Sequence, residues 1–139
     1  MTVQRTLGLV KPDAVSAGST GAILAMIQAA GLKIVALRMT RIAAVEAEAF
    51  YAVHKERGFY GELCAFMSSG PIVAMVLEGP DAIVAWRNLM GPTDSTKAGP
   101  DTVRGRYGAS VSLNAVHGSD APETAAVEIP FFFPARELI

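Results

Sequence analysis

The segment Ile72-Val73-Ala74-Met75-Val76-Leu77 is a continuous apolar run, bounded by Gly70-Pro71 on one side and Gly79-Pro80 on the other. Glycine and proline interrupt regular structure, so the run has the length of a single strand. An apolar residue at every position, rather than at every second one, is typical of a strand that is covered on both faces. We therefore expect residues 72–77 to form a central strand of a sheet.

A strand and a helix are expected at the start of the chain. Residues 3–10 favour a strand that ends before Pro12, because proline cannot donate a hydrogen bond within a sheet. Lys11 is therefore expected at the carboxyl end of this strand, where ligands often bind. After a turn at residues 18–21, a helix is expected to end near Gly31. Its apolar residues recur at helical spacing and are Ile23, Leu24, Ile27 and Ala30.

A second strand and helix are expected before the central run. Residues 32–42 alternate between apolar and polar types, so Val35, Leu37 and Met39 are expected on one face of a strand. The residues expected on the buried side of the next helix are Val45, Ala49, Phe50 and Val53, and the same helix carries Tyr51 and His54.

A helix and an irregular segment are expected to follow the central run. Asp81 is a good residue to cap a helix that continues to about Leu89. Residues 91–108 show no long amphipathic period, so they form either a long functional loop or a stretch without a role. The residues expected on the inner side of the helix are Ile83, Trp86 and Met90, with Arg87 near its end.

The last predicted elements lie on either side of a histidine. Residues 111–116 favour a short strand, and Asp120 with Glu123 three residues later predicts a capping box for a short helix that ends near Glu128. The whole order is strand, helix, strand, helix, strand, helix, strand. This order predicts an α+β fold: a ferredoxin-like, four-stranded antiparallel sheet covered by helices, in a single domain of residues 1–139.

The composition of the chain limits the classes of function that it can have. The chain has 139 residues, of which 51% are hydrophobic, and a net charge of −1, so it can bury a core and has no general affinity for nucleic acid. The only cysteine, Cys64, excludes an intrachain disulfide and is expected to be a buried, inert thiol. Residues 1–5 do not resemble a secretion signal, and no apolar run reaches membrane-spanning length. We expect a cytoplasmic protein without a membrane partner.

His117 is the strongest candidate for chemistry, in the run Asn114-Ala115-Val116-His117-Gly118-Ser119-Asp120. An imidazole is largely neutral near pH 7, so it can attack an electrophile without an auxiliary base. Gly118 is expected to leave room for a bulky group such as phosphate, and Ser119 and Asp120 favour a helix start. The alternative is a hairpin histidine beside an ordinary helix cap.

Several polar residues that fall outside the regular periods suit phosphate handling. Phosphoryl transfer needs positive charge on the equatorial oxygens and an in-line nucleophile. For each of these residues taken alone, a solvated surface side chain is the more common role, and it is their occurrence together with a poised histidine that favours phosphate handling. No G-x-x-x-x-G-K-[ST] or G-x-G-x-x-G loop is present, so a nucleotide must be held in another way. The set is Lys11, Tyr51, His54, Arg87, Thr93, Arg104 and Asn114, beside His117.

The sequence gives weaker evidence for a base-binding site and for a metal site. The aromatic residues Phe59-Tyr60 can stack a base, although core packing is the common role of such a pair. The residues Asp13, Asp94 and Asp120 do not have the spacing of a dedicated metal cage. Mg²⁺ commonly arrives on substrate phosphates and keeps most of its waters, so we expect Mg²⁺ held mainly by the nucleotide.

These motifs together closely resemble the nucleoside diphosphate kinase family over nearly the whole chain. The resemblance implies the ferredoxin-like fold and a ping-pong exchange of the terminal phosphate between nucleoside triphosphates and diphosphates, through a phosphohistidine at His117 and with broad base tolerance. The segments that carry it are Arg5-Thr6, Lys11-Pro12-Asp13, Gly31-Leu32-Lys33-Ile34, Phe50-Tyr51-Ala52-Val53-His54, Phe66 to Pro71, Leu77-Glu78-Gly79, Met90 to Thr93, Thr102 to Gly105 and Asn114 to Asp120.

The resemblance also implies roles for individual residues. Phe59 matches the residue that stacks on the base, with Val111 on the other side, and Lys11 and Asn114 match residues that contact the sugar hydroxyl. Ser119 and Glu128 match residues behind the histidine, and a carboxylate that accepts a proton from one ring nitrogen leaves the other, Nδ1, free to attack. The residues that match phosphate-holding positions are His54, Arg87, Thr93 and Arg104, with Tyr51 close to the transferred group.

The chain departs from the usual family pattern at four positions. Gly58 and Ser95 stand where prolines are common, and we expect them to loosen their loops. Asp101 and Arg106 replace a usual glycine and a frequent acid, so the family pattern does not predict the local charge and subunit contacts there. The resemblance implies a homo-oligomer, either a tetramer or a hexamer.

Two other functions are compatible with such a fold. A nucleotide-sensing or single-strand nucleic-acid-binding module needs a basic, aromatic sheet face. The chain is slightly acidic and its predicted strands lack a run of exposed aromatic residues, so no nucleic-acid partner is expected. An inactive homologue is the other alternative, but every matched catalytic position holds a competent residue type.

Overall fold

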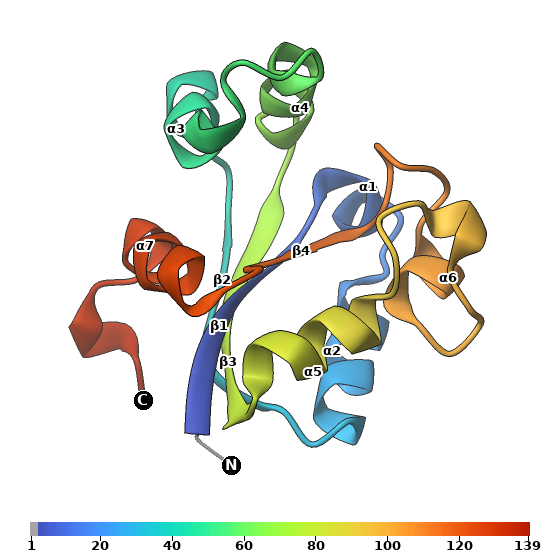
Figure 1. The fold of residues 1–139 in the computed structure, drawn as a ribbon, viewed down its shortest axis with the longest axis vertical. Coiled ribbons are helices and arrows are strands. Elements are labelled where there is room, and N and C mark those ends of the chain that lie inside the picture. Colours follow the sequence, from blue (N-terminus) through green and yellow to red (C-terminus); the bar gives the residue numbers. More distant parts are fainter. Residues whose placement is uncertain (1–2) are drawn as a thin grey trace.

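The structure is a computed structural model that describes residues 3–139; Met1 and Thr2, part of the segment in which we expect no secretion signal, lie outside these residues. Its centre is a four-stranded antiparallel sheet with the strand order β2-β3-β1-β4 (Figure 1). The predicted ferredoxin-like α+β fold is confirmed. The strands are β1 (Val3–Val10), β2 (Lys33–Thr40), β3 (Ile72–Pro80) and β4 (Val116–Gly118).

Strand β3 is central, as its apolar run predicts. It pairs with β1 from Val3↔Pro80 to Val10↔Val73, and with β2 on its other side. All residues from Ile72 to Leu77 are buried, because helices cover both faces of the sheet at this strand. The apolar side chains of the run therefore enter two separate cores.

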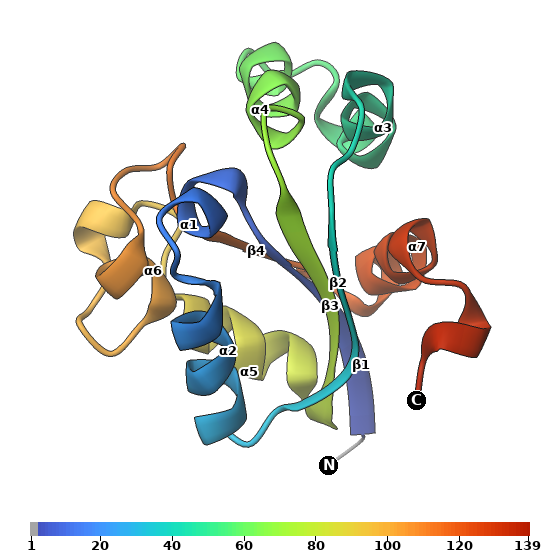
Figure 2. The same cartoon turned by 180° about the vertical axis from the view of Figure 1, so that it is seen from behind.

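Helices form a layer on each side of the sheet. Helices α2 and α5 lie over one face, α7 lies over the other, and α3 and α4 stand together at one end (Figures 1 and 2). No helix among residues 3–139 is long and apolar enough to span a membrane. The helices are α1 (Pro12–Ser16), α2 (Thr20–Ala29), α3 (Ala44–Phe50), α4 (Tyr60–Met67), α5 (Ala82–Met90), α6 (Val103–Tyr107) and α7 (Pro122–Phe132), with 3₁₀ turns at Ala52–His54, Ser95–Lys97 and Ala135–Glu137.

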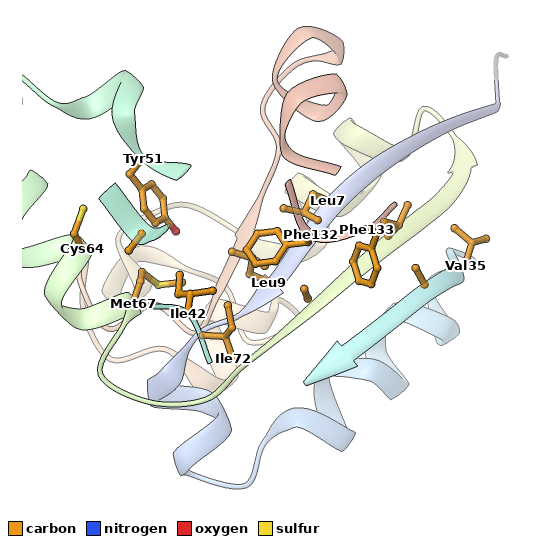
Figure 3. Packing of buried hydrophobic residues seen from close by; sticks show 14 residues of the cluster. Leu7, Leu9, Val35, Ile42, Tyr51, Cys64, Met67, Ile72, Phe132 and Phe133 are labelled. Carbon is orange, nitrogen blue, oxygen red and sulfur yellow. The ribbon is translucent and has the colours of Figure 1, made fainter. Parts of the chain in front are cut away.

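Each face of the sheet has its own hydrophobic core. On one face, Leu7 and Leu9 of β1 pack beneath Phe132 and Phe133, while the α3–α4 end contributes Tyr51, Cys64 and Met67 (Figure 3). Cys64 is a buried free thiol, as predicted, and burial raises its pKa. The residues at the centre of the second core, under α2 and α5, are Ile23, Ile27, Met75, Leu77, Trp86 and Met90.

Strand β2 contains a bulge that the alternating pattern does not reveal. Ile34 pairs with Leu77 but Ala36 pairs with Val76, so Val35 is an extra residue. One extra residue moves the following side chains to the opposite face. The prediction that Val35, Leu37 and Met39 share a face is therefore wrong: Val35 is buried, whereas Leu37 and Met39 are 51% and 60% exposed.

Helix α3 buries a different side from the one predicted. It ends at Phe50, so Tyr51 and His54 lie beyond it, with His54 in a 3₁₀ turn. Ala47 is fully buried and Phe50 and Tyr51 pack beside it, whereas Val45, Ala49 and Val53 are exposed. Val45 and Ala49 lie within the helix, so its end at Phe50 does not explain their exposure; the prediction fails there because this short helix carries apolar residues on more than one side and their spacing does not select the buried one.

Helix α5 has the predicted inner side but not the predicted cap. Ile83, Trp86 and Met90 are buried, as expected, and the helix continues to Met90. Asp81 has a positive φ of 47° and makes no side-chain cap. The amide of Ile83 instead donates a hydrogen bond of 2.9 Å to Oε1 of Gln4, so a residue distant in sequence caps the helix.

Residues 91–108 contain more regular structure than their composition indicates. A 3₁₀ turn is capped by Asp94, which accepts from the Thr96 amide at 3.0 Å, and α6 is capped by Thr102, which accepts from the Gly105 amide at 3.0 Å. The exposed side chains of Asp101 and Arg106 lie 3.9 Å apart as an ion pair. Helix α1 was also not predicted; it starts at Pro12, since proline suits the first turn of a helix.

The last strand and helix are displaced from their predicted positions. Strand β4 is Val116–Gly118 rather than 111–116, so His117 lies within the strand, opposite Leu9. Ala115 has a positive φ of 72°, which breaks an extended chain before Val116. Helix α7 reaches Phe132, past Glu128, and Thr124, not Glu123, accepts from the Ala121 amide at 3.0 Å.

Ser95 generates a stability prediction. Its hydroxyl is buried without a hydrogen-bond partner, and it occupies the first position of a 3₁₀ turn after the extended residue Asp94. Proline suits this position and restricts the unfolded chain, so Ser95→Pro should stabilise the fold by about 0.5–1 kcal/mol and raise Tm by a few degrees, roughly 2–4 °C per kcal/mol. Ser95→Ala, measured in the same thermal melt, separates loss of the hydroxyl from the backbone effect. A lower Tm for Ser95→Pro would show that the loop rejects the ring.

Candidate active site

One cavity of about 760 Å³ collects the predicted nucleotide-binding residues. Its wall is built by the end of β1, the α3–α4 end of the molecule, α5, the segment between α5 and β4, and α7. These elements are far apart in sequence, so only the fold brings their side chains together. The predicted residues that line the cavity are Lys11, Tyr51, His54, Phe59, Arg87, Thr93, Arg104, Val111, Asn114, His117 and Glu128.

His117 is held at its backbone and at one ring nitrogen. Its backbone pairs with β1, and its carbonyl accepts a hydrogen bond of 3.2 Å from Trp86 Nε1. Its Nε2 lies 3.0 Å from Oε1 of Glu128. A carboxylate only accepts, so Nε2 carries the hydrogen in the neutral ring and Nδ1 keeps a lone pair. Nδ1 forms no hydrogen bond with any residue of the described part of the chain.

Ser119 connects Glu128 to the central sheet. Its hydroxyl is fully buried, donates to Glu128 Oε1 at 2.9 Å and accepts from the Leu7 amide at 3.3 Å. The same Glu128 oxygen is therefore fixed by two side chains, those of Ser119 and His117. Ser119 lies behind the cavity wall rather than on it, and its hydrogen bonds fix Glu128.

Lys11 is a buried cation at the carboxyl end of β1. Its Nζ donates to Asn114 Oδ1 at 2.8 Å, and Asn114 Nδ2 in turn donates to the Thr93 carbonyl at 3.2 Å. Burial lowers the pKa of Lys11 to about 8; nearby Asp13 opposes this shift and Arg104 adds to it. Three predicted site residues, Lys11, Thr93 and Asn114, thus form one hydrogen-bonded group.

Arg104 lines the cavity and also holds the backbone around it in place. Its guanidinium donates to the carbonyls of Asn114 at 3.3 Å, Gly91 at 2.9 Å and Val116 at 2.9 Å. Burial and the neighbouring Arg87 lower its pKa to about 10. Three of the five guanidinium hydrogens are used by the protein, so two remain for a ligand.

Arg87 and Asp120 flank His117. Arg87 Nη1 donates at 3.5 Å to the carbonyl of Gly118. The pKa of Asp120 is lowered, first by its hydrogen bond with Thr124 and also by the charges of Arg87 and His117. Asp120 and Thr124 both line the cavity, although sequence reasoning assigned them only to the helix start, if at all.

Aromatic and apolar side chains form another part of the cavity wall. The ring centroids of His54 and Phe59 are 5.5 Å apart, and those of Tyr51 and His54 are 6.3 Å apart in a stacked arrangement. Burial raises the pKa of the Tyr51 hydroxyl. Phe59 and Val111 are 48% and 55% exposed, so neither is consumed by core packing. Base stacking on Phe59 stays a prediction.

Gly118 does not have the predicted role. A Cβ atom at Gly118 would lie 2.6 Å from Trp86 Cδ1 and 2.7 Å from Met90 Cε. The missing side chain therefore makes room for the tryptophan of α5, not for an approaching phosphate. The expectation was wrong because the sequence does not show toward which face of β4 a side chain at position 118 would point.

Sequence reasoning also missed several residues of the wall. Phe50, at the end of α3, was expected only on a buried helix side. Glu62 and Leu63 lie one turn after Phe59 on α4. This helical spacing is the only feature of the sequence from which their place beside Phe59 could have been predicted. The missed wall residues include Phe50, Glu62, Leu63, Asp120 and Thr124.

Comparison with known proteins identifies the family of the chain. The sequence model of the nucleoside diphosphate kinase family matches residues 4–138. The chain belongs to the nucleoside diphosphate kinase family. Nucleoside diphosphate kinases of Thiobacillus denitrificans and Bordetella avium are 55% and 54% identical to it, over 99% and 96% of this chain and 97% and 95% of theirs.

Solved nucleoside diphosphate kinases have the same fold. The Aquifex aeolicus enzyme has a TM-score of 0.97 at 48% identity and covers 99% of this chain and 100% of its own. The Halobacterium salinarum enzyme, solved with CDP, has a TM-score of 0.95 at 41% identity, with coverage of 99% and 92%. The chain is thus a phosphotransferase that moves the terminal phosphate between nucleoside tri- and diphosphates, and a non-catalytic sensor or nucleic-acid module is not favoured.

The hydrogen bonds of Ser119 predict a loss of stability on their removal. Ser119→Ala leaves the buried Leu7 amide and Glu128 each one partner short, so it should destabilise the fold by about 1–3 kcal/mol in chemical denaturation. Thr6→Val is the matched control, because the neighbouring Thr6 hydroxyl is buried without a partner. Its removal should be neutral or stabilising. Equal losses in both variants would contradict the assigned role of Ser119.

The pKa of Lys11 predicts a pH dependence of binding. The free protein loses this charge as pH rises through about 8, because burial disfavours the charged amine. Binding of an anionic nucleotide restores the proton, so the Kd for a nucleoside diphosphate should rise above pH 8, by at most roughly tenfold per pH unit. Calorimetric titration from pH 7 to 9 measures this slope. Lys11→Gln should bind more weakly and with little slope; an unchanged slope would assign the proton to another group.

Proposed function

We propose that His117 carries the phosphate in a ping-pong reaction. Nδ1 attacks the terminal phosphorus of a nucleoside triphosphate, the bond to the bridging oxygen breaks, and the diphosphate leaves with the electron pair. An acceptor diphosphate then attacks the phosphohistidine, and its terminal oxygen takes the phosphoryl group from Nδ1. The observation that carries this proposal is the 3.0 Å contact of Nε2 with Glu128, which leaves Nδ1 as the free nucleophile.

Glu128 has a specific task in this mechanism. Attack by Nδ1 places positive charge on the ring, and the carboxylate beside the Nε2 hydrogen stabilises it. Ser119 holds the same carboxylate oxygen at 2.9 Å, so the carboxylate stays in place as charge develops. Both are positioning residues, because neither touches the phosphate in this scheme.

The other residues of the cavity are assigned to parts of the nucleotide. Phe59 and Val111 hold the two faces of the base, and stacking of this kind tolerates any base because every base has a π-face. Lys11 and Asn114 bind the sugar hydroxyl, a role supported by their mutual hydrogen bond of 2.8 Å in the wall. The phosphates are assigned to His54, Arg87, Thr93 and Arg104, with Tyr51 beside the transferred group.

Mg²⁺ is assigned mainly to the nucleotide phosphates. No group of three or more His, Cys, Asp or Glu side chains between residues 3 and 139 could enclose a metal ion. Mg²⁺ suits a site with one or two carboxylates and several phosphate oxygens, and Asp120, which lines the cavity, is close enough to Arg87 and His117 for their charges to lower its pKa. The ion supplies charge neutralisation on the phosphates when it is bound.

The assembly and location complete the proposal. We assign a homo-oligomer, either tetramer or hexamer, in the cytoplasm. The outer edge of β2 has no strand partner in the described chain and carries the exposed side chains of Leu37 and Met39. An exposed apolar strand edge favours pairing with another copy.

A labelling experiment tests the mechanism. Incubation with γ-labelled ATP and no acceptor should place an acid-labile, alkali-stable label on the protein, and His117→Ala should take up none. Addition of a purine or pyrimidine diphosphate should then discharge the label. Absence of label, or label that persists in His117→Ala, excludes His117 as the carrier, and strong rejection of pyrimidines contradicts the assignment of Phe59.

A further inference from the structure

Phe50 is the one aromatic residue of the cavity wall that touches His117 and has no assigned task. It is the last residue of α3 and is partly buried. Its ring centroid lies 5.5 Å from that of His117, with an angle of 68° between the planes. This is an edge-to-face contact, the favoured geometry of an aromatic pair.

The other contacts of His117 leave its ring orientation incompletely fixed. Strand pairing with Leu9 and the hydrogen bond from Trp86 fix the backbone. Glu128 fixes Nε2, but one hydrogen bond at one ring atom acts as a pivot about which the ring plane can turn. A side wall is needed to stop this rotation, and the rings that form it are Phe50 and, at 6.0 Å and 90°, Tyr51.

Phe50 is itself held by neighbours from two elements. Its ring centroid is 4.9 Å from that of Tyr51 and 5.2 Å from those of Phe131 and Phe132, all in edge-to-face arrangements. Phe131 and Phe132 belong to the last turn of α7, the helix that also carries Glu128. The ring of Phe50 is therefore a rigid support.

We propose that Phe50 is a positioning residue that holds the imidazole plane of His117 in line with the nucleotide phosphate. This inference rests on the proposed role of His117 as phosphate carrier. In-line transfer depends on the direction of the Nδ1 lone pair, and a small misplacement of reacting atoms is costly in rate. Phe50 supplies no charge and no proton; it limits rotation of the ring that does the chemistry.

A leucine at this position tests the proposal. Phe50→Leu keeps an apolar side chain but removes the flat ring. It should lower the rate of phosphoenzyme formation about tenfold, while KM for nucleotide stays within about twofold, because orientation is lost and binding is not. Phe50→Tyr restores a ring and should restore most of the rate.

A second leucine variant separates positioning from packing. Phe133 is a buried residue of the same core and lies beyond the contacts of His117, where it packs on Arg38 with a guanidinium-to-ring distance of 5.0 Å. Phe133→Leu should lower Tm at least as much as Phe50→Leu but leave the phosphorylation rate near that of the parent. Equal losses of rate in the two leucine variants would reduce Phe50 to a packing residue.

The imidazole itself gives a direct readout. The chain has two histidines, so His117→Ala assigns their ¹⁵N ring signals. The parent should show one Nε2–H tautomer at His117, and Phe50→Leu a mixture with greater ring mobility. Unchanged signals together with an unchanged rate would overturn the proposal. If the parent protein takes up no label on His117, the proposed function fails instead, so the two failures are distinguishable.

Discussion

A chain of hydrogen bonds from the central sheet to the imidazole is the constraint on which the site depends. It runs from the Leu7 amide to the Ser119 hydroxyl, then to Glu128, and from Glu128 to Nε2 of His117. Its members come from β1, the end of β4 and α7. The orientation of the histidine ring therefore depends on how α7 packs on the sheet. This hydrogen-bond chain thereby decides which ring nitrogen of His117 carries the hydrogen and which keeps its lone pair.

The opposite wall of the cavity depends on buried cations. Arg104 donates three hydrogen bonds, to the carbonyls of Gly91, Asn114 and Val116, and Lys11 donates one to the side chain of Asn114. Buried charges are tolerated only with such partners. The two cations that we assign to the nucleotide therefore also hold the segment between α5 and β4 in place, and substitution of either one is expected to affect both binding and local structure.

Local pattern predicted the elements well where one periodicity runs without interruption. The run at residues 72–77 predicted its central strand, and Ile83, Trp86 and Met90 predicted the inner side of α5. Pattern failed in two places, for different reasons. In the short helix α3 the apolar residues do not single out one side, so their spacing did not predict the buried one. In β2 the bulge at Val35 reverses the faces, and a bulge arises from pairing with a distant strand, which no local window contains.

The sequence by itself indicated the family and its chemistry, because a histidine, several cations and an aromatic residue occur in the order typical of nucleoside diphosphate kinases. It also determined the fold class, because apolar periods and their order survive small errors in element bounds. Only the tertiary structure decided that His117 lies inside β4, that Gly118 makes room for Trp86 and that Phe50 touches the imidazole. The physical reason is that hydrogen bonds and ring contacts are directional, and their directions are set by elements that lie far apart in the chain.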